Sequence, residues 1–245
     1  MDIDICMTAA LRPDIIKSTL CSLENNLDMA AHSVRLIVDI AKVGDLHFSQ
    51  QGVLAVIYET VPSWDVLPRT LPECSIQAEA LRWTWQTSTS PFILQWEDDW
   101  TLEKKVSLSA MIECFFAFPK LGILGLDRIG KSVLGNTRYS KGTFAQVDVC
   151  AFQRNKSKSL GGPPAMMCRN YINAVIPLLD GVTCLDVLSA APKAQKILSN
   201  WGVFIFTGLD NKGGLVKDIG KQWRSDRGLK MVKNTDRGVT WTKKS

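Results

Sequence analysis

The sequence predicts an α/β fold with a mostly parallel central sheet flanked by helices, and two observations lead to this prediction. Short apolar runs at Ile3–Met7, Val34–Ile40 and Phe92–Leu94 have the β-branched and aromatic composition of buried strands. Segments with helical periodicity separate these runs, and such alternation is typical of a parallel sheet. The chain has 245 residues, which suits one large domain or one domain with a subdomain, and its 46% hydrophobic and 22% charged residues are ordinary for a globular protein.

The first predicted strand leads into a helix. Pro13 suits the first turn of that helix, because the N–H that proline lacks is not needed there. Thr8 and Arg12 therefore lie between a strand end and a helix start, a position that nucleotides commonly occupy. The helix carries an apolar face formed by Ile15, Ile16, Leu20 and Leu23.

The next segments continue the alternation up to residue 87. Asp39 lies near the carboxyl end of the second strand, where an acid can bind a base or a ribose hydroxyl, or can equally cap a helix. We expect a third strand at Leu54–Tyr58 and a loop at Val61–Pro72, which contains three prolines. A helix is predicted at Ser75–Thr87, with Ser75 as its N-cap.

Three adjacent acids, Glu97, Asp98 and Asp99, follow the strand that begins at Phe92, and Trp96 and Trp100 flank them. Carboxylates in this position lie at the carboxyl edge of the sheet, where open α/β sheets bind ligands. Clustered oxygens suit Mg²⁺ or Mn²⁺, which commonly join one or two carboxylates to a substrate phosphate. The alternative is a solvated acidic turn, but the two flanking tryptophans favour a functional site.

The second half of the chain is predicted to be more irregular. Residues 127–159 are polar and basic and indicate an antiparallel ribbon or a long loop, which contains a short strand at Val147–Phe152. Gly161, Gly162 and Pro163 predict a rigid turn suited to holding a substrate, or a plain turn between elements. The other expected elements are a helix at Ser107–Phe118, a strand at Leu121–Leu126, a helix at Tyr171–Leu179 and a strand at Val203–Phe206.

The net charge of +5 is unevenly distributed. Residues 217–245 carry a net charge of +6 and residues 127–158 a net charge of +5, so the remainder is acidic. Two basic segments indicate a polyanionic partner or a diphosphate ligand, although a solvated tail and loop would give the same pattern.

The seven cysteines are scattered and include no Cys-x-x-Cys pair, so we expect neither a zinc site nor a disulfide framework. His32 and His47 lie far from the acids in the sequence and are expected at the surface or in turns. The sequence contains no run of about 18 apolar residues, so we expect no membrane span. The N-terminus lacks the basic region of a secretory signal. These features lead us to expect a cytoplasmic protein, or one in the host cytoplasm if it is viral.

The order of these motifs resembles that of GT-A glycosyltransferases of the broad family-two kind, which use nucleotide sugars. The matching segments span nearly the whole chain: Thr8–Pro13, Asp39, Glu97–Trp100, Gly161–Pro163, and Asp218–Trp223 continuing to Arg227-Gly228. The resemblance implies a GT-A type fold with a Rossmann-like sheet in one domain. It also implies a nucleotide-binding half at 1–102, an acceptor half at 103–216 and a basic C-terminal segment at 217–245.

The resemblance also implies roles for individual residues. Asp99 and Glu97 would hold Mn²⁺ or Mg²⁺ on the donor diphosphate, with Glu97 replacing the first aspartate of the family's Asp-x-Asp motif. Trp100, Gly161, Gly162 and Pro163 would contact the acceptor. The donor would be bound by Thr8, Ala9, Arg12, Asp39, Glu97 and Asp98, assisted by Lys217 and Lys221 from the basic segment.

Two departures from the family pattern affect the chemistry. Thr207 follows the last core strand where many relatives have a histidine that binds the metal. Inverting relatives use an acid beyond the Gly-Gly-Pro loop as general base, and the candidates here are Asp180 and Asp186. Without a clear motif around them, the sequence does not distinguish inversion from retention.

We therefore expect a metal-dependent glycosyltransferase that moves a sugar, expected to be a hexose, from a nucleotide sugar such as a UDP-sugar to an acceptor hydroxyl. The two basic segments favour DNA with hydroxymethylated bases as the acceptor, as in phage DNA glycosyltransferases, and Trp223 and Trp241 would stack on or flank an extruded base. A saccharide, a lipid-linked glycan or a protein is the alternative acceptor. Two alternatives to glycosyl transfer remain: a nucleotidyltransferase and a non-catalytic nucleic-acid-binding domain.

Overall fold

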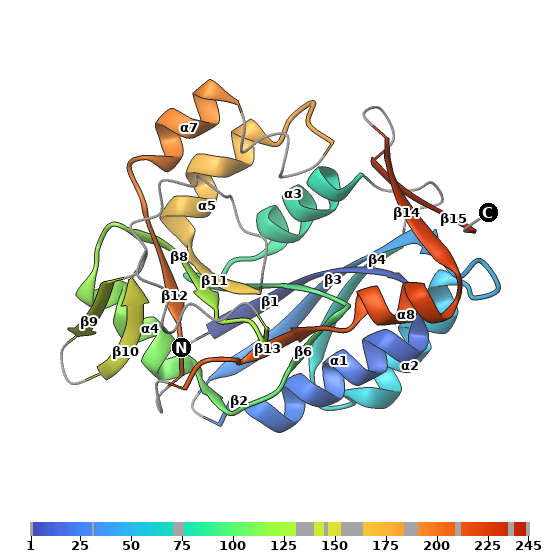
Figure 1. Cartoon of the computed structure of the whole chain (residues 1–245), viewed down its shortest axis with the longest axis horizontal. Helices are drawn as coiled ribbons and strands as arrows, with labels where there is room; N and C mark the ends of the chain where they lie inside the picture. Colours follow the sequence, from blue (N-terminus) through green and yellow to red (C-terminus); the bar gives the residue numbers. More distant parts are fainter. Residues whose placement is uncertain are drawn as a thin grey trace.

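The computed structural model describes residues 2–30, 32–70, 76–130, 140–144, 147–152, 164–183, 191–208, 212–234 and 238–243. The first half consists of β1 (Asp2–Leu11), α1 (Pro13–Asn26), β2 (Leu27–Asp28), β3 (Ser33–Gly44), α2 (Gln50–Thr60), β4 (Asp65–Thr70), α3 (Gln77–Thr87), β5 (Phe92–Glu97), β6 (Trp100–Leu102), β7 (Val106–Ser107) and α4 (Leu108–Ala117) (Figure 1). The second half consists of β8 (Leu121–Leu126), β9 (Ser140–Phe144), β10 (Val147–Phe152), β11 (Ala165–Cys168), α5 (Arg169–Val175), the 3-10 helix η1 (Ile176–Leu178), α7 (Pro192–Leu198), β12 (Gly202–Phe206), β13 (Val216–Asp218), α8 (Gly220–Asp226), β14 (Leu229–Asn234) and β15 (Gly238–Lys243).

The described strands form one nine-stranded sheet in the order β4-β3-β1-β5-β11-β8-β12-β10-β9, together with three small two-stranded sheets. β1 is parallel to both β3 and β5, β3 is parallel to β4, and β8 is parallel to β12. β11 lies antiparallel between β5 and β8, and β9 and β10 form an antiparallel ribbon at one edge. The predicted α/β class with a mostly parallel sheet and a small antiparallel ribbon is confirmed.

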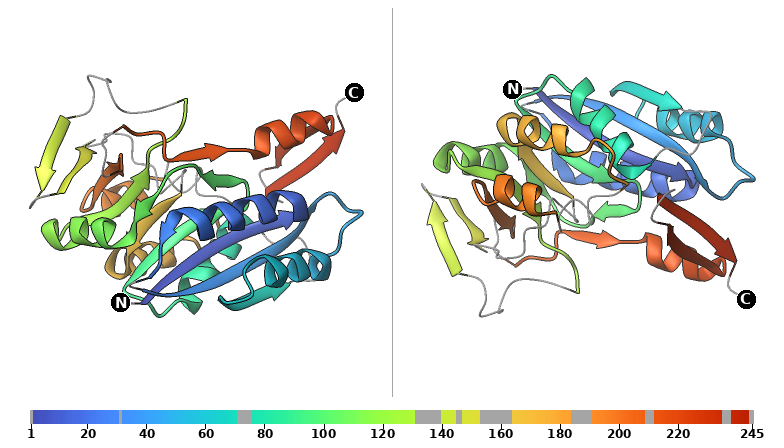
Figure 2. Two further views of the ribbon diagram at one scale, coloured as in Figure 1. Left: turned by 90° about the horizontal axis from the view of Figure 1, so that it is seen from below. Right: turned by 90° about the horizontal axis from the view of Figure 1, so that it is seen from above.

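Helices cover both faces of the sheet (Figure 2). On one face, α1 and α2 pack their apolar sides on a large buried cluster, in which Ile16, Leu20, Leu23, Val53 and Ile57 are fully buried. On the other face, α3 and α5 form a second cluster around Trp85 and Tyr171. The apolar face predicted for α1 is confirmed, because all four of its residues are buried.

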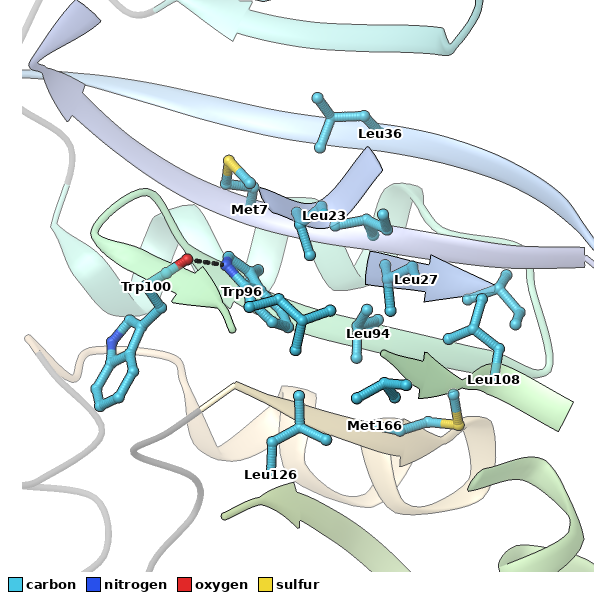
Figure 3. Packing of buried hydrophobic residues seen from close by; sticks show 14 of the residues in the cluster. Met7, Leu23, Leu27, Leu36, Leu94, Trp96, Trp100, Leu108, Leu126 and Met166 are labelled. Carbon is cyan, nitrogen blue, oxygen red and sulfur yellow. Dashed lines mark hydrogen bonds between the residues drawn. The ribbon is translucent and has the colours of Figure 1, made fainter. Parts of the chain in front are cut away.

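Trp96 lies inside the first cluster and connects the core to the acidic turn. Its side chain is fully buried, and its Nε1 donates a hydrogen bond of 2.8 Å to the carbonyl oxygen of Trp100 (Figure 3). This hydrogen bond fixes the turn that carries Asp98 and Asp99 to a buried side chain. Burying a large apolar side chain contributes about 1.5–3 kcal/mol to the free energy of folding.

The strand predicted at Leu54–Tyr58 is wrong, because this segment belongs to helix α2. Ser49 caps the helix by accepting a hydrogen bond of 3.0 Å from the backbone N–H of Gly52. Val53 and Ile57, four residues apart, are the buried residues of the helix, whereas Tyr58 is exposed. A short apolar run does not by itself distinguish a strand from a helix, and here the spacing of four determines the outcome.

The loop predicted at Val61–Pro72 is also wrong in its centre, where residues 65–70 form strand β4. Among the described strands, β4 lies at the edge of the sheet and pairs only with β3, so Pro68 at this edge costs little. α3 begins at Gln77 with Ile76 at its N-cap position, while the predicted cap, Ser75, lies outside the described residues.

Most other predicted elements are confirmed within a few residues: α1, α4, β8, β10, β12 and the helical segment formed by α5 and η1. β1 extends four residues past the predicted Met7, so Thr8 is part of the strand. Within the described ranges, no helix has both the length and the apolar character needed to cross a membrane.

Candidate active site

Four residues on neighbouring strands form one row across the carboxyl half of the sheet. Thr8 on β1 lies opposite both Asp39 on β3 and Glu97 on β5, and Asp39 lies opposite Arg69 on β4. Parallel pairing brings these residues together although up to 89 positions separate them in the sequence. The row lies where open α/β sheets bind ligands.

A pocket of about 170 Å³ opens beside this row. Its walls come from the ends of β1, β3 and β5, from the first turns of α3, and from α8. The lining residues are Thr8, Ala9, Ala10, Arg12, Asp39, Ala41, Val43, Gln77, Ala80, Glu97, Asp98, Asp99 and Arg224. The structure thus brings together Thr8, Ala9, Arg12, Asp39, Glu97, Asp98 and Asp99, all of which were selected from the sequence.

Asp98 holds Arg12 in place. The guanidinium of Arg12 binds both carboxylate oxygens of Asp98, with its Nε donating to Oδ2 at 3.2 Å, and the backbone N–H of Ala10 donates to the same oxygen at 3.0 Å. Only 2% of Asp98 is exposed. Burial raises the pKa of Asp98 and Arg12 opposes this rise, and the pKa of Arg12 is raised because Asp98 and Asp99 outweigh the effect of its burial. The carboxylate oxygens of Asp98 are therefore already occupied, and Asp98 orients the guanidinium of Arg12 at the pocket.

Asp99 is shared between two arginines. Its Oδ2 accepts a hydrogen bond of 3.1 Å from Arg12 Nη1 and lies 3.6 Å from Arg224 Nη1. Its backbone carbonyl accepts a hydrogen bond of 2.9 Å from the N–H of Ile219, at the start of α8. The side chain remains 14% exposed, so it is accessible from the pocket.

Glu97 is influenced by the negative charges of the two other acids. Gln77 Nε2 donates a hydrogen bond of 3.2 Å to its Oε1. Burial, together with the negative charges of Asp99 and Asp98, raises the pKa of Glu97 to about 8. A carboxyl group in this state is protonated near neutral pH and becomes charged readily when a cation approaches.

The C-terminal helix α8 is anchored on the start of α1. Trp223 Nε1 donates to both carboxylate oxygens of Asp14, at 3.1 and 2.9 Å, and Arg227 Nη2 lies 3.0 Å from Asp14 Oδ2. The guanidinium of Arg227 lies 4.3 Å from the centre of the Trp223 ring. This anchor brings Arg224 to the pocket.

At the other end of the row, Arg69 connects Asp39 to α3. Its Nε donates to Asp39 Oδ2, and its guanidinium lies 4.7 Å from the centre of the Trp83 ring. Asp39 is almost completely buried and still lines the pocket.

Glu97 and Asp99 fit a site for Mg²⁺ or Mn²⁺. They are alternate residues on the acidic turn and both line the pocket. Within the described part of the chain, no group of three or more acidic, histidine or cysteine side chains has metal-binding geometry. Mg²⁺ usually takes only one or two carboxylates and completes its shell with water and substrate phosphate. The raised pKa of Glu97 fits this arrangement, because an added cation would favour the charged form.

Other predicted site residues lie elsewhere. Lys217 and Lys221 do not line the pocket, and Lys221, 70% exposed, pairs with Asp218 at 2.9 Å. Thr207, expected in place of a metal-binding histidine, is fully buried and likewise outside the pocket lining. Asp186, Gly161, Gly162 and Pro163 lie outside the described residues.

Asp180 lies at a second cavity of about 500 Å³, formed around the first turns of α3 and the segment after η1. Its carboxylate is exposed and pairs with Arg82 at 3.0 Å. Trp100, predicted to contact the acceptor, is only 7% exposed, and Arg128 lies over its ring.

Arg224 and Arg128 were not identified from the sequence. Arg224 is in the C-terminal motif, one residue after Trp223, but the two lysines of the same segment were selected instead. Helical periodicity favours Arg224 over the lysines as a pocket residue. Arg224 lies four residues after Gly220 and next to Trp223, and these two are the buried residues of α8.

The fold is similar to that of solved glycosyltransferases at low sequence identity. A structure of S. aureus TarS in complex with UDP matches 89% of this chain and 60% of its own chain, with a TM-score of 0.56 and 9% identity. The S. aureus TarS complex with UDP-GlcNAc has a TM-score of 0.55 and 8% identity, over 89% of this chain and 58% of that chain. The mannosyltransferase PcManGT from Pyrobaculum calidifontis, in complex with GDP-Man and Mn²⁺, has a TM-score of 0.57 and 14% identity, over 92% of this chain and 60% of that chain.

These matches confirm the predicted GT-A type fold. The chain spans about 60% of the length of these three structures, and 36% of a longer TarS chain with a TM-score of 0.57. No protein-family model matches the sequence, and a search of the curated proteins found no match.

Proposed function

We propose that the protein is a glycosyltransferase that moves a sugar from a nucleoside diphosphate sugar to an acceptor hydroxyl. One observation carries this proposal: the pocket at the carboxyl edge of the sheet combines two accessible carboxylates, Glu97 and Asp99, with the guanidinium groups of Arg12 and Arg224. Such a set of charges suits a diphosphate bound through a divalent cation. The nucleotide and nucleotide-sugar complexes of the structurally similar proteins support the same class of donor.

The lining residues support one orientation of the donor. Asp39, Thr8 and Ala9 lie at the strand ends, where the base and ribose would bind, with Arg69 fixing Asp39. The diphosphate would then lie between the acidic turn and α8, near Arg12 and Arg224. A UDP-sugar is the donor we favour, and a hexose the group transferred.

Glu97 and Asp99 would hold Mg²⁺ or Mn²⁺, which would offset the charge of the leaving diphosphate. The protein contributes its own cations to the same task. Arg12 is fixed by Asp98, and Arg224 is fixed by the anchor of α8, so both are oriented before the donor arrives. Such preorganised charges stabilise a transition state more than mobile ones do.

In the reaction, the acceptor oxygen attacks the anomeric carbon and the bond from that carbon to the β-phosphate oxygen breaks. The nucleoside diphosphate leaves with the electron pair of that bond, and the hydroxyl proton passes to a base. Asp180 and Asp186 remain our candidates for this base. Asp180 lies beside α3, whose first turns also contribute Gln77 and Ala80 to the donor pocket.

The charge distribution favours a polyanionic acceptor. Residues 217–245 carry a net charge of +6, and they include α8, which borders the pocket. DNA with hydroxymethylated bases is the acceptor that we favour, and a saccharide, lipid-linked glycan or protein is the alternative. Binding to duplex DNA that weakens steeply with added salt would favour DNA.

A donor screen tests the proposal. The melting temperature is measured with UDP, GDP, ADP and CDP, each with and without Mn²⁺, for the wild type and for Asp99→Asn. We expect one nucleotide to raise the wild-type melting temperature more with Mn²⁺ than alone, and Asp99→Asn to lose this difference. Glu59→Gln removes an exposed acid on α2 and is the matched control. Turnover should release a free nucleoside diphosphate, whereas release of pyrophosphate would identify a nucleotidyltransferase and overturn the proposal.

A further inference from the structure

Arg128 is a cation for which the described structure provides no anion. Its side chain is half-buried, yet no carboxylate of a described residue lies within ion-pair distance of its guanidinium. The other arginines with described side chains hydrogen-bond to carboxylates or carbonyl oxygens, or, for Arg224, form an ion pair with a carboxylate. Burial lowers the pKa of Arg128, and the more distant charges of Asp218 and Glu97 only partly oppose this effect.

The position of Arg128 is rigidly determined. The preceding residue, Asp127, is buried, and its carboxylate accepts a hydrogen bond of 2.9 Å from the N–H of Gly214. The backbone of Arg128 forms a parallel bridge with Val216, and the N–H of Ile129 donates to the Val216 carbonyl at 2.9 Å. The backbone that carries this guanidinium is therefore fixed on both sides.

The guanidinium rests on an aromatic surface. Its central carbon lies 5.0 Å from the centre of the Trp100 ring. Trp100 is fixed in turn, because its strand β6 pairs with β13 and its carbonyl accepts the hydrogen bond from Trp96. The guanidinium is planar, and its fork of N–H groups matches the oxygens of a phosphate or carboxylate.

Asp218, at the end of strand β13, already has partners of its own. Asp218 accepts hydrogen bonds from the backbone N–H groups of Gly220 and Lys221, at 3.1 and 3.3 Å, and pairs with the ammonium of Lys221. A half-buried cation without a partner is costly unless an anion neutralises it, so a ligand anion is the natural counterpart of Arg128.

An anion bound to Arg128 would lie outside the pocket that Glu97 and Asp99 line. Neither Trp100 nor Arg128 lines that pocket, although Trp100 directly follows the acidic turn that does. Arg128 comes instead from the end of β8, in the half of the chain beyond the acidic turn. A group bound here would approach the reacting centre from outside the donor site.

We propose that Arg128, held on the ring of Trp100, binds a phosphodiester group of the acceptor and thereby positions its hydroxyl group for transfer. This inference rests on the proposed function. It narrows the acceptor to a molecule with a phosphate near the hydroxyl that receives the sugar. The excess positive charge of residues 127–158 and 217–245 favours phosphodiesters over isolated carboxylates as the anion.

Nuclear magnetic resonance of isotope-labelled protein tests the proposal with dimethyl phosphate as the probe. The indole N–H signal of Trp100, assigned with Trp100→Phe, is followed while dimethyl phosphate is added in the presence of saturating UDP and Mn²⁺. We expect a saturable shift in the wild type and an affinity about tenfold weaker in Arg128→Gln, because one charge-assisted bidentate contact is lost. Arg128→Lys should recover only part of the affinity, since it restores the charge without the planar fork.

Lys120→Gln is the matched control, because Lys120 is an exposed cation just before the other end of β8. An unchanged response in Arg128→Gln, or an equal loss in Lys120→Gln, would overturn the proposal. Acetate that binds as well as dimethyl phosphate would overturn the assignment to a phosphodiester. A response to dimethyl phosphate that is present without UDP but absent with saturating UDP would overturn the proposal and assign Arg128 to the donor's β-phosphate.

The same samples separate this proposal from the proposed function. UDP binding is measured first from the pocket signals, and we expect Arg128→Gln to retain the wild-type UDP affinity, which also verifies that it is folded. A wild type that binds no nucleoside diphosphate contradicts the proposed function, whether or not Arg128 binds phosphate. A wild type that binds UDP but shows no Arg128-dependent response contradicts only the acceptor site.

Discussion

The carboxylate of Asp99 occupies the space that a side chain at position 220 would need: a Cβ on Gly220 would lie 2.0 Å from Asp99 Oδ2. We therefore expect Gly220→Ala to push α8 away from the acidic turn. The cost should be about 1–3 kcal/mol of unfolding free energy, as for other overpacked sites. It should also weaken UDP binding, because Arg224 moves with α8. Urea unfolding and UDP titration measure the two effects.

Gly52→Ala is the control for this substitution. Gly52 is an exposed residue of α2, and its added Cβ would meet only the Ser49 hydroxyl at 3.4 Å. Replacing glycine by alanine within a helix stabilises it by up to about 1 kcal/mol. If both alanine variants behave alike, the close approach of Gly220 to Asp99 has no consequence for α8.

Asp99→Asn should abolish metal-dependent turnover of the donor while the protein remains folded. The amide keeps the shape of the side chain but loses the negative charge that would bind the cation and that also attracts Arg12 and Arg224. Donor hydrolysis with Mn²⁺ and a far-UV spectrum measure activity and fold. Wild-type turnover by Asp99→Asn would contradict the assigned site.

Asp98→Asn should act on stability more than Asp99→Asn does. Asp98 is buried and binds the buried guanidinium of Arg12 through both of its oxygens. Removing one partner of such a pair leaves an unpaired buried charge and costs about 3–5 kcal/mol. Chemical denaturation of the two variants provides the comparison. A smaller loss for Asp98→Asn than for Asp99→Asn would mean that Asp98 is not the structural acid of the triplet.

Sequence alone could predict that Thr8, Asp39 and Glu97 lie near the ends of strands, because the composition of a few adjacent residues indicates where a strand ends. The acids after Phe92 and the helix start at Pro13 are both signals of a few adjacent residues. The prediction for Leu54–Tyr58 failed because five apolar residues fit either periodicity. The features that favour a helix lie outside this run: the Ser49 cap, and Val53 four residues before Ile57. Arg224 and Arg128 depend on tertiary contacts, with Asp14 and Trp223 in one case and Trp100 in the other. Local spacing carries no information about such contacts.

Arg224→Gln should weaken binding of UDP far more than binding of uridine. Arg224 lines the pocket beside Asp99, so its charge should act on the diphosphate rather than on the base. One charge-assisted hydrogen bond contributes about 1.5–3 kcal/mol, which corresponds to roughly 10- to 150-fold in the dissociation constant. Calorimetric titration with both ligands measures the difference. Lys221→Gln, in the preceding turn of α8, is the control, and a larger effect from Lys221 would return the role to the lysine.

Glu97 should make the protein less stable as the pH rises through the neutral range. Its pKa is about 8 in the folded protein and near the ordinary value of 4.5 in the unfolded chain. Between these values the folded state retains a proton that the unfolded state has lost, so the free energy of unfolding falls as the pH increases. Below the lower value both states are protonated and the effect vanishes; above the higher value the whole cost remains.

Glu97→Gln should remove this pH dependence. At about pH 9, without divalent cations, the variant should be more stable than the wild type by ~1–3 kcal/mol, a value reduced because the side chain is partly exposed to solvent. At about pH 4 the two proteins should have nearly equal stability, since Glu97 is then uncharged in both states. Urea unfolding at several pH values measures the difference between wild type and variant, which cancels the contributions of all other groups. Parallel pH curves for the two proteins would mean that Glu97 titrates as an ordinary solvated acid and that the acids of the turn do not crowd one another.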